Sequence, residues 1–216
     1  MDPLRAAIAC VPLAAYLLLM GVVNLRRRPM LTTGGADLVA LGLGLTGFVF
    51  IGPIELFHLP PRASGLGGYA WLFWLVLYWT GLALAAMVLR PRLVIYNAGL
   101  DQARPAVAQA VSQLDPDARW AGDSVVLPRL GVQMHLEAFG VMRNTSLVAS
   151  GGEQNLEGWR RLRKAVSRAL APLAVQPNPR SVSFFIMGGF LTGVVLVRLT
   201  MLPLEVAKAL GEVFAY

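Results

Sequence analysis

Long apolar stretches dominate the pattern of hydrophobic and polar positions along this chain. A membrane-spanning helix needs about 20 mostly apolar residues. Two of the stretches contain no Asp, Glu, Lys or Arg, whereas Glu55 lies near the end of another and Arg198 near the end of the last. The pattern predicts four transmembrane helices, at about residues 6–23, 38–57, 69–89 and 182–202.

Residues 91–180 follow a different pattern, in which apolar positions recur over short distances. From Val132 to Ala138 every second residue is apolar, which is typical of a half-buried strand. Apolar residues three and four apart predict amphipathic helices over residues 101–114 and 156–170. Further strands are expected at residues 93–96, 124–127 (with Trp120 before the preceding turn) and 144–149.

The predicted order of these elements is β-α-β-β-β-α. This order indicates an α+β arrangement, with helices packed on one mostly antiparallel sheet. A ferredoxin-like variant is the first expectation, and a PH-like domain is the alternative because several strands precede a terminal helix. The predicted fold class is therefore an α-helical integral membrane protein with an inserted small α+β domain.

The two patterns divide the chain into three parts. Residues 1–90 form a membrane domain with three predicted helices, and residues 91–180 form the α+β domain. Residues 181–216 hold the fourth transmembrane helix and, after Pro203, a short amphipathic helix. Because only residues 90–92 separate the third transmembrane helix from the first strand, we expect the α+β domain to lie against the lipid headgroups.

Composition agrees with this division and excludes several kinds of site. The chain is 56% hydrophobic and 14% charged, with a mean hydropathy of +0.59, whereas about a quarter of the residues in soluble domains are charged. Residues 91–180 contain 11 Lys+Arg and 7 Asp+Glu, which is closer to soluble composition. Cys10 is the single cysteine, so an intrachain disulfide and a Cys-based zinc site are excluded. No cofactor is expected.

The net charge of +7 predicts how the chain is oriented. Six arginines lie in the first loop or at the two ends of the α+β domain, whereas the opposite side of the membrane would have four basic residues. Cytoplasmic loops carry the excess of Lys and Arg, so residues 91–180 are expected in the cytoplasm and both termini outside a cell (inner or plasma) membrane. No zinc-finger, RNP or helix-turn-helix pattern appears, so no nucleic-acid partner is expected.

Small residues recur at helical spacing inside the predicted transmembrane helices. The stretch from Gly42 to Gly47 matches GxGxxG, but it lies in mid-span, where a dinucleotide site lacks its strand, its helix and its water. Small residues let helix backbones approach closely in a membrane. They predict tight packing within one chain, with a protein partner or in a homo-oligomer, through Gly42, Gly44, Gly47, Gly81, Ala85, Gly189 and Gly193.

Two polar residues stand three apart near the end of the second predicted transmembrane helix. Glu55 and His58 are weak candidates for a proton-relay or metal pair, since ionisable groups in membrane spans are often functional. Hydration at the membrane interface is the simpler interpretation. Neither a nucleophile-elbow serine nor an HExxH or P-loop pattern occurs, so no catalytic residue is predicted.

The last predicted helix of the α+β domain is basic on one face. Two interpretations are open: an ordinary solvated face, or a surface that binds anionic lipid headgroups or an acidic partner, because a domain tethered near a membrane meets both. Its residues are Arg160, Arg161, Arg163, Lys164 and Arg168.

The absence of a catalytic pattern favours a non-enzymatic multi-pass membrane subunit. Such a protein would act in assembly, anchoring or regulation of a membrane complex, through helix packing and its cytoplasmic domain. Two alternatives stay open. A small transport or channel component would need to oligomerise, and a lipid-active membrane enzyme would depend on Glu55 and His58.

Overall fold

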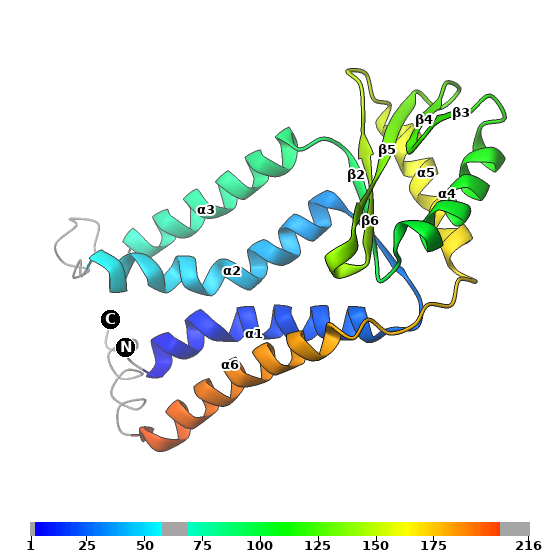
Figure 1. Cartoon of the computed structure of the whole chain (residues 1–216). Coiled ribbons are helices and arrows are strands. Elements are labelled where there is room, and N and C mark those ends of the chain that lie inside the picture. The colour runs from blue at the N-terminus through cyan, green and yellow to red at the C-terminus, as the bar shows by residue number, and fades with distance from the viewer. Residues whose placement is uncertain (1–2, 58–68, 204–216) are drawn as a thin grey trace. The chain divides into compact units, whose positions relative to one another are not determined.

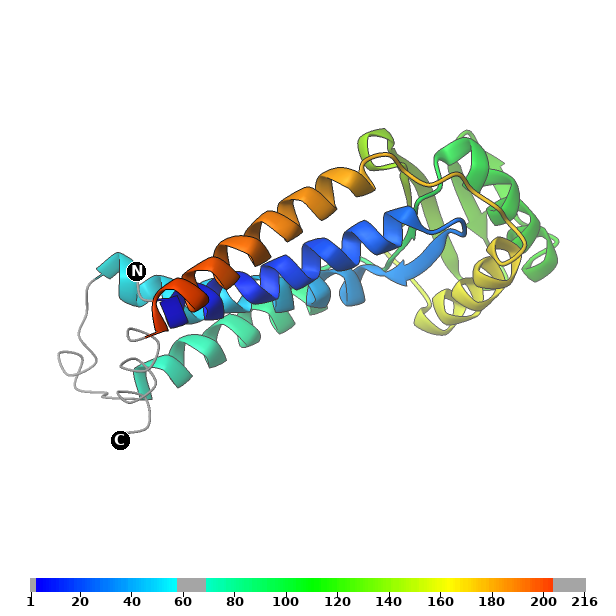
Figure 2. The same ribbon diagram turned by 90° about the horizontal axis from the view of Figure 1, so that it is seen from below.

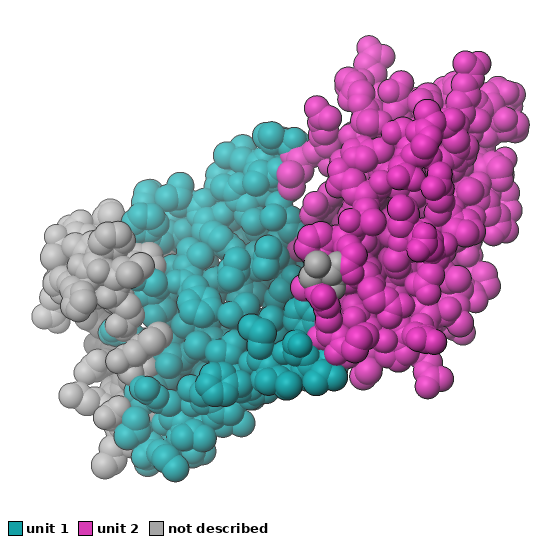
Figure 3. Space-filling model, viewed as in Figure 1, with its two compact units in different colours: residues 1–21, 38–88, 182–216 teal, residues 22–37, 89–181 magenta. Residues whose placement is uncertain are grey.

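The computed structural model describes residues 3–57 and 69–203 of the chain (Figure 1). These residues belong to two compact units, which are coloured teal and magenta in Figure 3. Unit 1 comprises the parts of residues 1–21, 38–88 and 182–216 that are described, and unit 2 comprises residues 22–37 and 89–181. The predicted amphipathic helix after Pro203 lies outside the described residues.

Unit 1 consists of long apolar helices. Three of them are long and apolar enough to cross a membrane, over Pro3–Leu25, Gly34–Gly52 and Ser181–Met201. The remaining apolar helix runs over Leu72–Val88 where its side chains are described and is shorter, so the third predicted transmembrane helix, at about residues 69–89, stays a prediction. The helices are α1 (Pro3–Leu25), α2 (Gly34–Phe57), α3 (Tyr69–Val88) and α6 (Ser181–Met201).

The helices of unit 1 carry apolar side chains on their outer faces as well as on their contact faces. Phe190 of α6 is 69% exposed and Leu72 of α3 is 57% exposed. A helix that is hydrophobic all round is buried in a large core or in a membrane. Because these faces meet no other described part of the chain, lipid is the solvent that suits them.

Unit 2 is built on a six-stranded sheet in which every neighbouring pair of strands is antiparallel. The order of strands across the sheet is β1-β2-β6-β5-β4-β3. Figures 1 and 2 show that two helices lie together on one face of this sheet. The elements are β1 (Met30–Thr33), β2 (Arg92–Tyr96), α4 (Leu100–Leu114), β3 (Arg119–Ala121), β4 (Ser124–Leu127), β5 (Val132–Phe139), the 3₁₀ turn η1 (Gly140–Met142), β6 (Asn144–Ala149) and α5 (Leu156–Leu170).

One hydrophobic core joins this face of the sheet to α4 and α5. Alternate residues of the strands point into it, among them Ile95, Met134 and Leu147, all fully buried. Trp159 and Leu162 enter it from α5. The alternation predicted for β5 is confirmed, since its apolar positions are buried up to Leu136 while the intervening ones are not.

The sheet contains a strand that the sequence patterns did not reveal. β1 comes from the segment between the first two long helices, and it pairs with β2 along its whole length, with Met30 opposite Tyr96 and Thr33 opposite Leu93. Residues 22–37 therefore belong to unit 2, and the boundary predicted at residue 91 is too simple. Four residues of moderate hydrophobicity form a strand here because an existing strand edge offers hydrogen bonds to them.

The order of elements also differs from the expected folds. The turn at Gly122 separates two strands, β3 and β4, so four strands rather than three follow α4. A ferredoxin-like chain alternates β-α-β-β-α-β. Here β3 to β6 form an uninterrupted meander and α5 ends the unit, so the ferredoxin-like order is not found. The early helix α4 also departs from the PH-like alternative, in which strands come first.

The pairing of β1 with β2 can be tested by cross-linking. In a Cys10→Ser background, Thr32→Cys with Val94→Cys places two cysteines directly opposite each other. Opposite Cα atoms in antiparallel strands are about 4.5–5.5 Å apart, within the range of a disulfide. Mild oxidation should therefore protect both thiols from a maleimide reagent added after denaturation.

The matched control for this test is Thr32→Cys with Ser146→Cys. Ser146 pairs with Val94 from the far side, so it lies two strands away from Thr32. That separation is roughly 10 Å, beyond the reach of a disulfide. Equal protection in the two variants would mean that β1 is not paired as described.

Candidate functional site

Three of the predicted packing glycines face neighbouring helices within unit 1. The carbonyl oxygen of Gly42 accepts a hydrogen bond from the Tyr78 hydroxyl of α3, at 2.9 Å. A Cβ at Gly44 would lie 2.9 Å from Cβ of Tyr16 on α1. A Cβ at Gly47 would meet the backbone of α1, at 2.7 Å from the carbonyl oxygen of Ala9. These glycines therefore let α2 approach both α1 and α3 closely.

The other predicted packing residues have no such neighbours. A Cβ built at Gly81, Gly189 or Gly193 would meet nothing within 4 Å in the described part of the chain, and Ala85 is exposed. The contact of α6 with α1 uses Gly188 instead, where a Cβ would lie 2.9 Å from Cγ of Leu18. The sequence pattern pointed to the neighbouring residue, because spacing alone does not tell which side of a uniformly apolar helix meets its neighbour.

The structure does not test the polar pair Glu55 and His58. Glu55 belongs to α2, but its side chain is not among those that the structure describes. His58 lies outside the described residues. Their proposed role as a proton-relay or metal pair stays a prediction.

A polar cluster that the sequence patterns did not indicate lies inside unit 2. We name it the asparagine junction and define it by Asn24, Asn97 and Asn178, each at most 2% exposed. The Asn178 side-chain amide donates to Oδ1 of Asn24 at 3.2 Å and to the carbonyl oxygen of Met142 at 3.0 Å. The Asn97 amide donates to the carbonyl oxygen of Arg26 at 2.6 Å. Buried polar groups are costly unless they are hydrogen-bonded, so these bonds fix the segments to one another.

The asparagine junction joins segments that are far apart in sequence. The backbone N–H of Asn178 also donates to the carbonyl oxygen of Asn24, at 2.9 Å, and that of Val175 donates to the carbonyl oxygen of Arg27, at 2.9 Å. The segment after α5 thus lies along the residues that follow α1. One signal was present in the sequence: Asn24 and Asn97 each stand where an apolar run ends.

A second polar contact joins the first turn of α2 to the sheet. Asp37 accepts a hydrogen bond from the Tyr96 hydroxyl and pairs with the Arg92 guanidinium at 3.4 Å. Arg92 and Tyr96 alternate along β2 with Leu93 and Ile95, which enter the core. Asp37 therefore lies on the face of the sheet that α4 and α5 do not cover.

The basic residues predicted on the last helix of the domain lie on α5 and are all exposed: Arg160, Arg161, Arg163, Lys164 and Arg168. The opposite side of α5 is buried in the core through Trp159, Leu162, Val166 and Leu170. The helix begins at an N-cap, Asn155, whose side chain accepts from the N–H groups of Glu157 and Gly158. Core packing and cap together fix which side of α5 faces outward.

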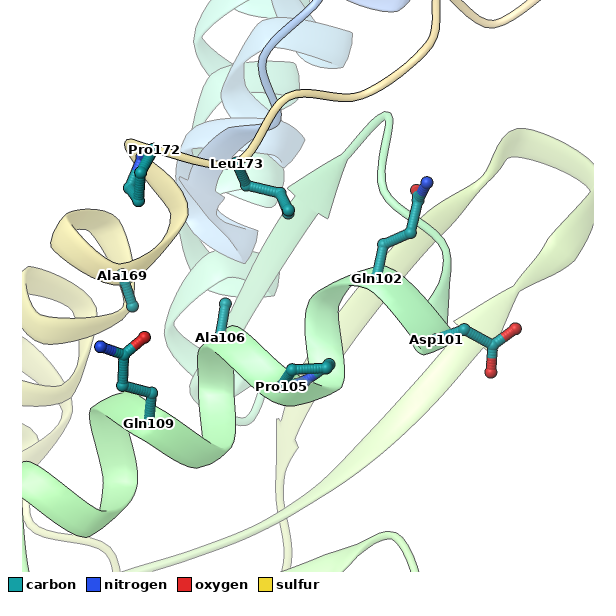
Figure 4. A pocket seen from close by; sticks show the side chains of 8 residues that line it. All are labelled: Asp101, Gln102, Pro105, Ala106, Gln109, Ala169, Pro172 and Leu173. Carbon is teal, nitrogen blue, oxygen red and sulfur yellow. The ribbon is translucent and has the colours of Figure 1, made fainter.

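The remaining features of unit 2 offer little for catalysis. His135 and Glu137 pair at 2.6 Å, but both are partly exposed and lie on the open face of the sheet. A shallow groove of about 470 Å³ between α4 and α5 has one ionisable lining residue, Asp101, at its rim (Figure 4). Within the described residues, no three His, Cys, Asp or Glu side chains are placed to hold a metal ion. Two exposed surfaces are candidates for contacts with other molecules, the helix faces of unit 1 and the basic side of α5.

The close approach of α2 to α1 yields a test of helix packing. Gly47→Ala would drive a methyl group into the backbone of α1 near Ile8 and Ala9. Overpacking of this kind costs about 1–3 kcal/mol, so thermal unfolding of the purified protein in detergent should shift to lower temperature. Gly52→Ala on the same helix is the control, because its new Cβ meets nothing within 4 Å. Equal unfolding temperatures for the two variants would contradict the described packing.

Comparisons with protein-family models, with curated proteins and with solved structures gave no match to this chain. Any function must therefore be argued from the sequence and from the geometry of these two units.

Proposed function

We propose that this protein is a non-enzymatic multi-pass membrane subunit, which acts in the assembly, anchoring or regulation of a membrane complex. The pairing of β1 with β2 is the observation that supports this most. It builds the segment between α1 and α2 into the sheet of the α+β domain. Because the loop between two long apolar helices is part of this sheet, the domain stays next to those helices in the chain, where a membrane complex would need it.

The same pairing supports a fourth membrane crossing. Thr33 lies opposite Leu93 in the sheet, so both residues are on one side of any membrane. If α2 crosses the membrane after Thr33, the chain must cross back before Leu93, and α3 is the apolar helix between them. The bond between Asn24 and Asn178 likewise supports a location of the end of α1 and the start of α6 on the same side of a membrane.

The distribution of charge supports a cytoplasmic location for unit 2. Its residues include 15 Lys+Arg and 8 Asp+Glu, whereas the rest of the chain has 4 of each. The whole net charge of +7 thus lies in unit 2. Because positive charge accumulates on the cytoplasmic side of membrane proteins, we place unit 2 in the cytoplasm and both termini outside a cell membrane.

The proposed orientation predicts the accessibility of an engineered cysteine. Gly152 is exposed and a Cβ there meets nothing within 4 Å, so Gly152→Cys in a Cys10→Ser background should not disturb the fold. A membrane-impermeant thiol reagent should fail to label this cysteine in intact cells and should label it after lysis. Ser64→Cys, in the predicted outer loop, should be labelled in intact cells. Labelling of Gly152→Cys in intact cells would reverse the proposed orientation.

The proposed function is tested by purification of the tagged full-length chain from its native membranes in mild detergent. We expect quantitative mass spectrometry to find at least one other protein in a constant molar ratio to the chain. An unrelated multi-pass protein with the same tag serves as the control for adventitious capture. Recovery of the chain alone, with no partner enriched over the control, would overturn the proposal.

A further inference from the structure

The outer side of α5 carries a line of cations that the fold does not use. Arg160, Lys164 and Arg168 are spaced four residues apart, so they lie in one row along the helix, with Arg161 beside them. We call these four residues the basic stripe. The side chains of Arg160 and Arg161 are 77% and 67% exposed. The stripe lies opposite the buried side of α5, so it can be contacted without any change in the core.

Most of this charge is not neutralised within the chain. Glu157 lies 3.5 Å from Arg160 and 3.6 Å from Arg161, one carboxylate shared by two guanidinium groups. Lys164 and Arg168 form no ion pair among the residues that the structure describes. Elsewhere in unit 2 the cations are mixed: Arg104 pairs with Asp123 and Arg129 with Asp117, whereas Arg119 and Arg143, which are not on α5, form no ion pair among the described residues. The stripe is therefore a local excess of positive charge.

The sheet separates the basic stripe from the point where the chain leaves unit 2 for α2. α5 packs on the face of the sheet that contains Leu93 and Ile95. The first turn of α2 lies on the other face, where Asp37 contacts Tyr96. The stripe is on the far side of α5, so it points away from that exit. The stripe and the residues that lead into α2 therefore lie on opposite sides of unit 2.

We propose that the basic stripe docks an acidic segment of a partner protein on the side of unit 2 opposite the first turn of α2. Arginine suits this role because its planar guanidinium binds carboxylates through two parallel hydrogen bonds. Nucleic-acid affinity comes largely from many phosphate contacts, whereas this short row supplies four cations, with the negative charge of Glu157 at its N-terminal end. The inference rests on the proposed function and names the chemistry of the partner.

The test uses the full-length protein in lipid nanodiscs and fluorescent poly-L-glutamate as the acidic probe. Lys164→Gln with Arg168→Gln removes two charges that have no ion-pair partner in the described chain. At about 0.2–1 kcal/mol for each exposed ion pair, this change should weaken binding roughly twofold to thirtyfold. Arg104→Gln with Arg119→Gln removes the same charge elsewhere on unit 2 and should have a smaller effect. Equal loss in the two variants would overturn the proposal.

Two further arms identify the other possible occupants. In nanodiscs that contain an anionic lipid, the affinity ratio of the wild type to the stripe variant should stay as in neutral nanodiscs. A ratio that falls to one would show that the stripe lies on lipid. A DNA duplex of equal charge should bind no more tightly than poly-L-glutamate, and tighter, stripe-dependent DNA binding would assign the stripe to nucleic acid. Either result would overturn the proposal.

The purification described for the proposed function separates the two claims. If the wild type retains a partner and the Lys164→Gln, Arg168→Gln variant loses it, while the Arg104→Gln, Arg119→Gln variant keeps it, both proposals are supported. If all three chains retain the partner, docking through the stripe is wrong and the proposed function stands. If the wild type has no partner, the proposed function fails. The comparison of poly-L-glutamate binding by the stripe variant and the control variant then decides by itself whether the stripe binds acidic chains.

Discussion

The antiparallel pairing of β1 with β2 is the constraint on which the rest of this structure depends. It makes a short segment between two long helices part of a sheet whose other strands lie more than fifty residues later. The backbone hydrogen bonds of β1 leave little freedom for the residues that precede it and follow it. The start of α2, immediately after Thr33, is therefore held next to β2, where Asp37 contacts Tyr96 and Arg92.

The asparagine junction extends this constraint to the other end of the domain. Asn178 binds Asn24 through both side chain and backbone, and Asn97 binds the carbonyl oxygen of Arg26. These groups are buried, so breaking one bond would leave a polar atom without water or a partner, at a cost of about 1–3 kcal/mol. The segments that enter and leave the α+β unit are thus joined to each other, within unit 2, by paired backbone groups and buried amides.

The two units expose surfaces of opposite character. The helices of unit 1 have apolar outer faces and come close together through glycines such as Gly44 and Gly47, which give no hydrophobic gain in lipid but permit backbone contact. Unit 2 has an ordinary buried core, and all of the net positive charge. Neither surface resembles a catalytic cleft. Both suit contacts with other molecules, which is why a role as a membrane subunit fits this chain best.

The sequence by itself determined the local features, because they depend on periodicity. The sequence predicted the apolar stretches from their length and composition. It also predicted the alternation along β5 and the exposed cations of α5, because these follow from repeats of two and about 3.6 residues. The uncertain points were also local: in a helix as uniformly apolar as α6, nothing in the pattern distinguishes Gly188, which meets α1, from Gly189, which does not.

Only the tertiary structure decided which distant residues meet. The segment Met30–Thr33 has no strand pattern of its own and becomes a strand because β2 offers an open edge to it. Asn24 and Asn97 look like ordinary polar residues at the ends of apolar runs, and Asn178 lies between two prolines, until folding brings them together. Packing likewise decides on which face of the sheet α5 lies, and therefore in which direction its basic stripe points. Strand pairing and side-chain burial depend on residues that are close in space but distant in sequence, so the spacing of residues along the chain does not reveal them.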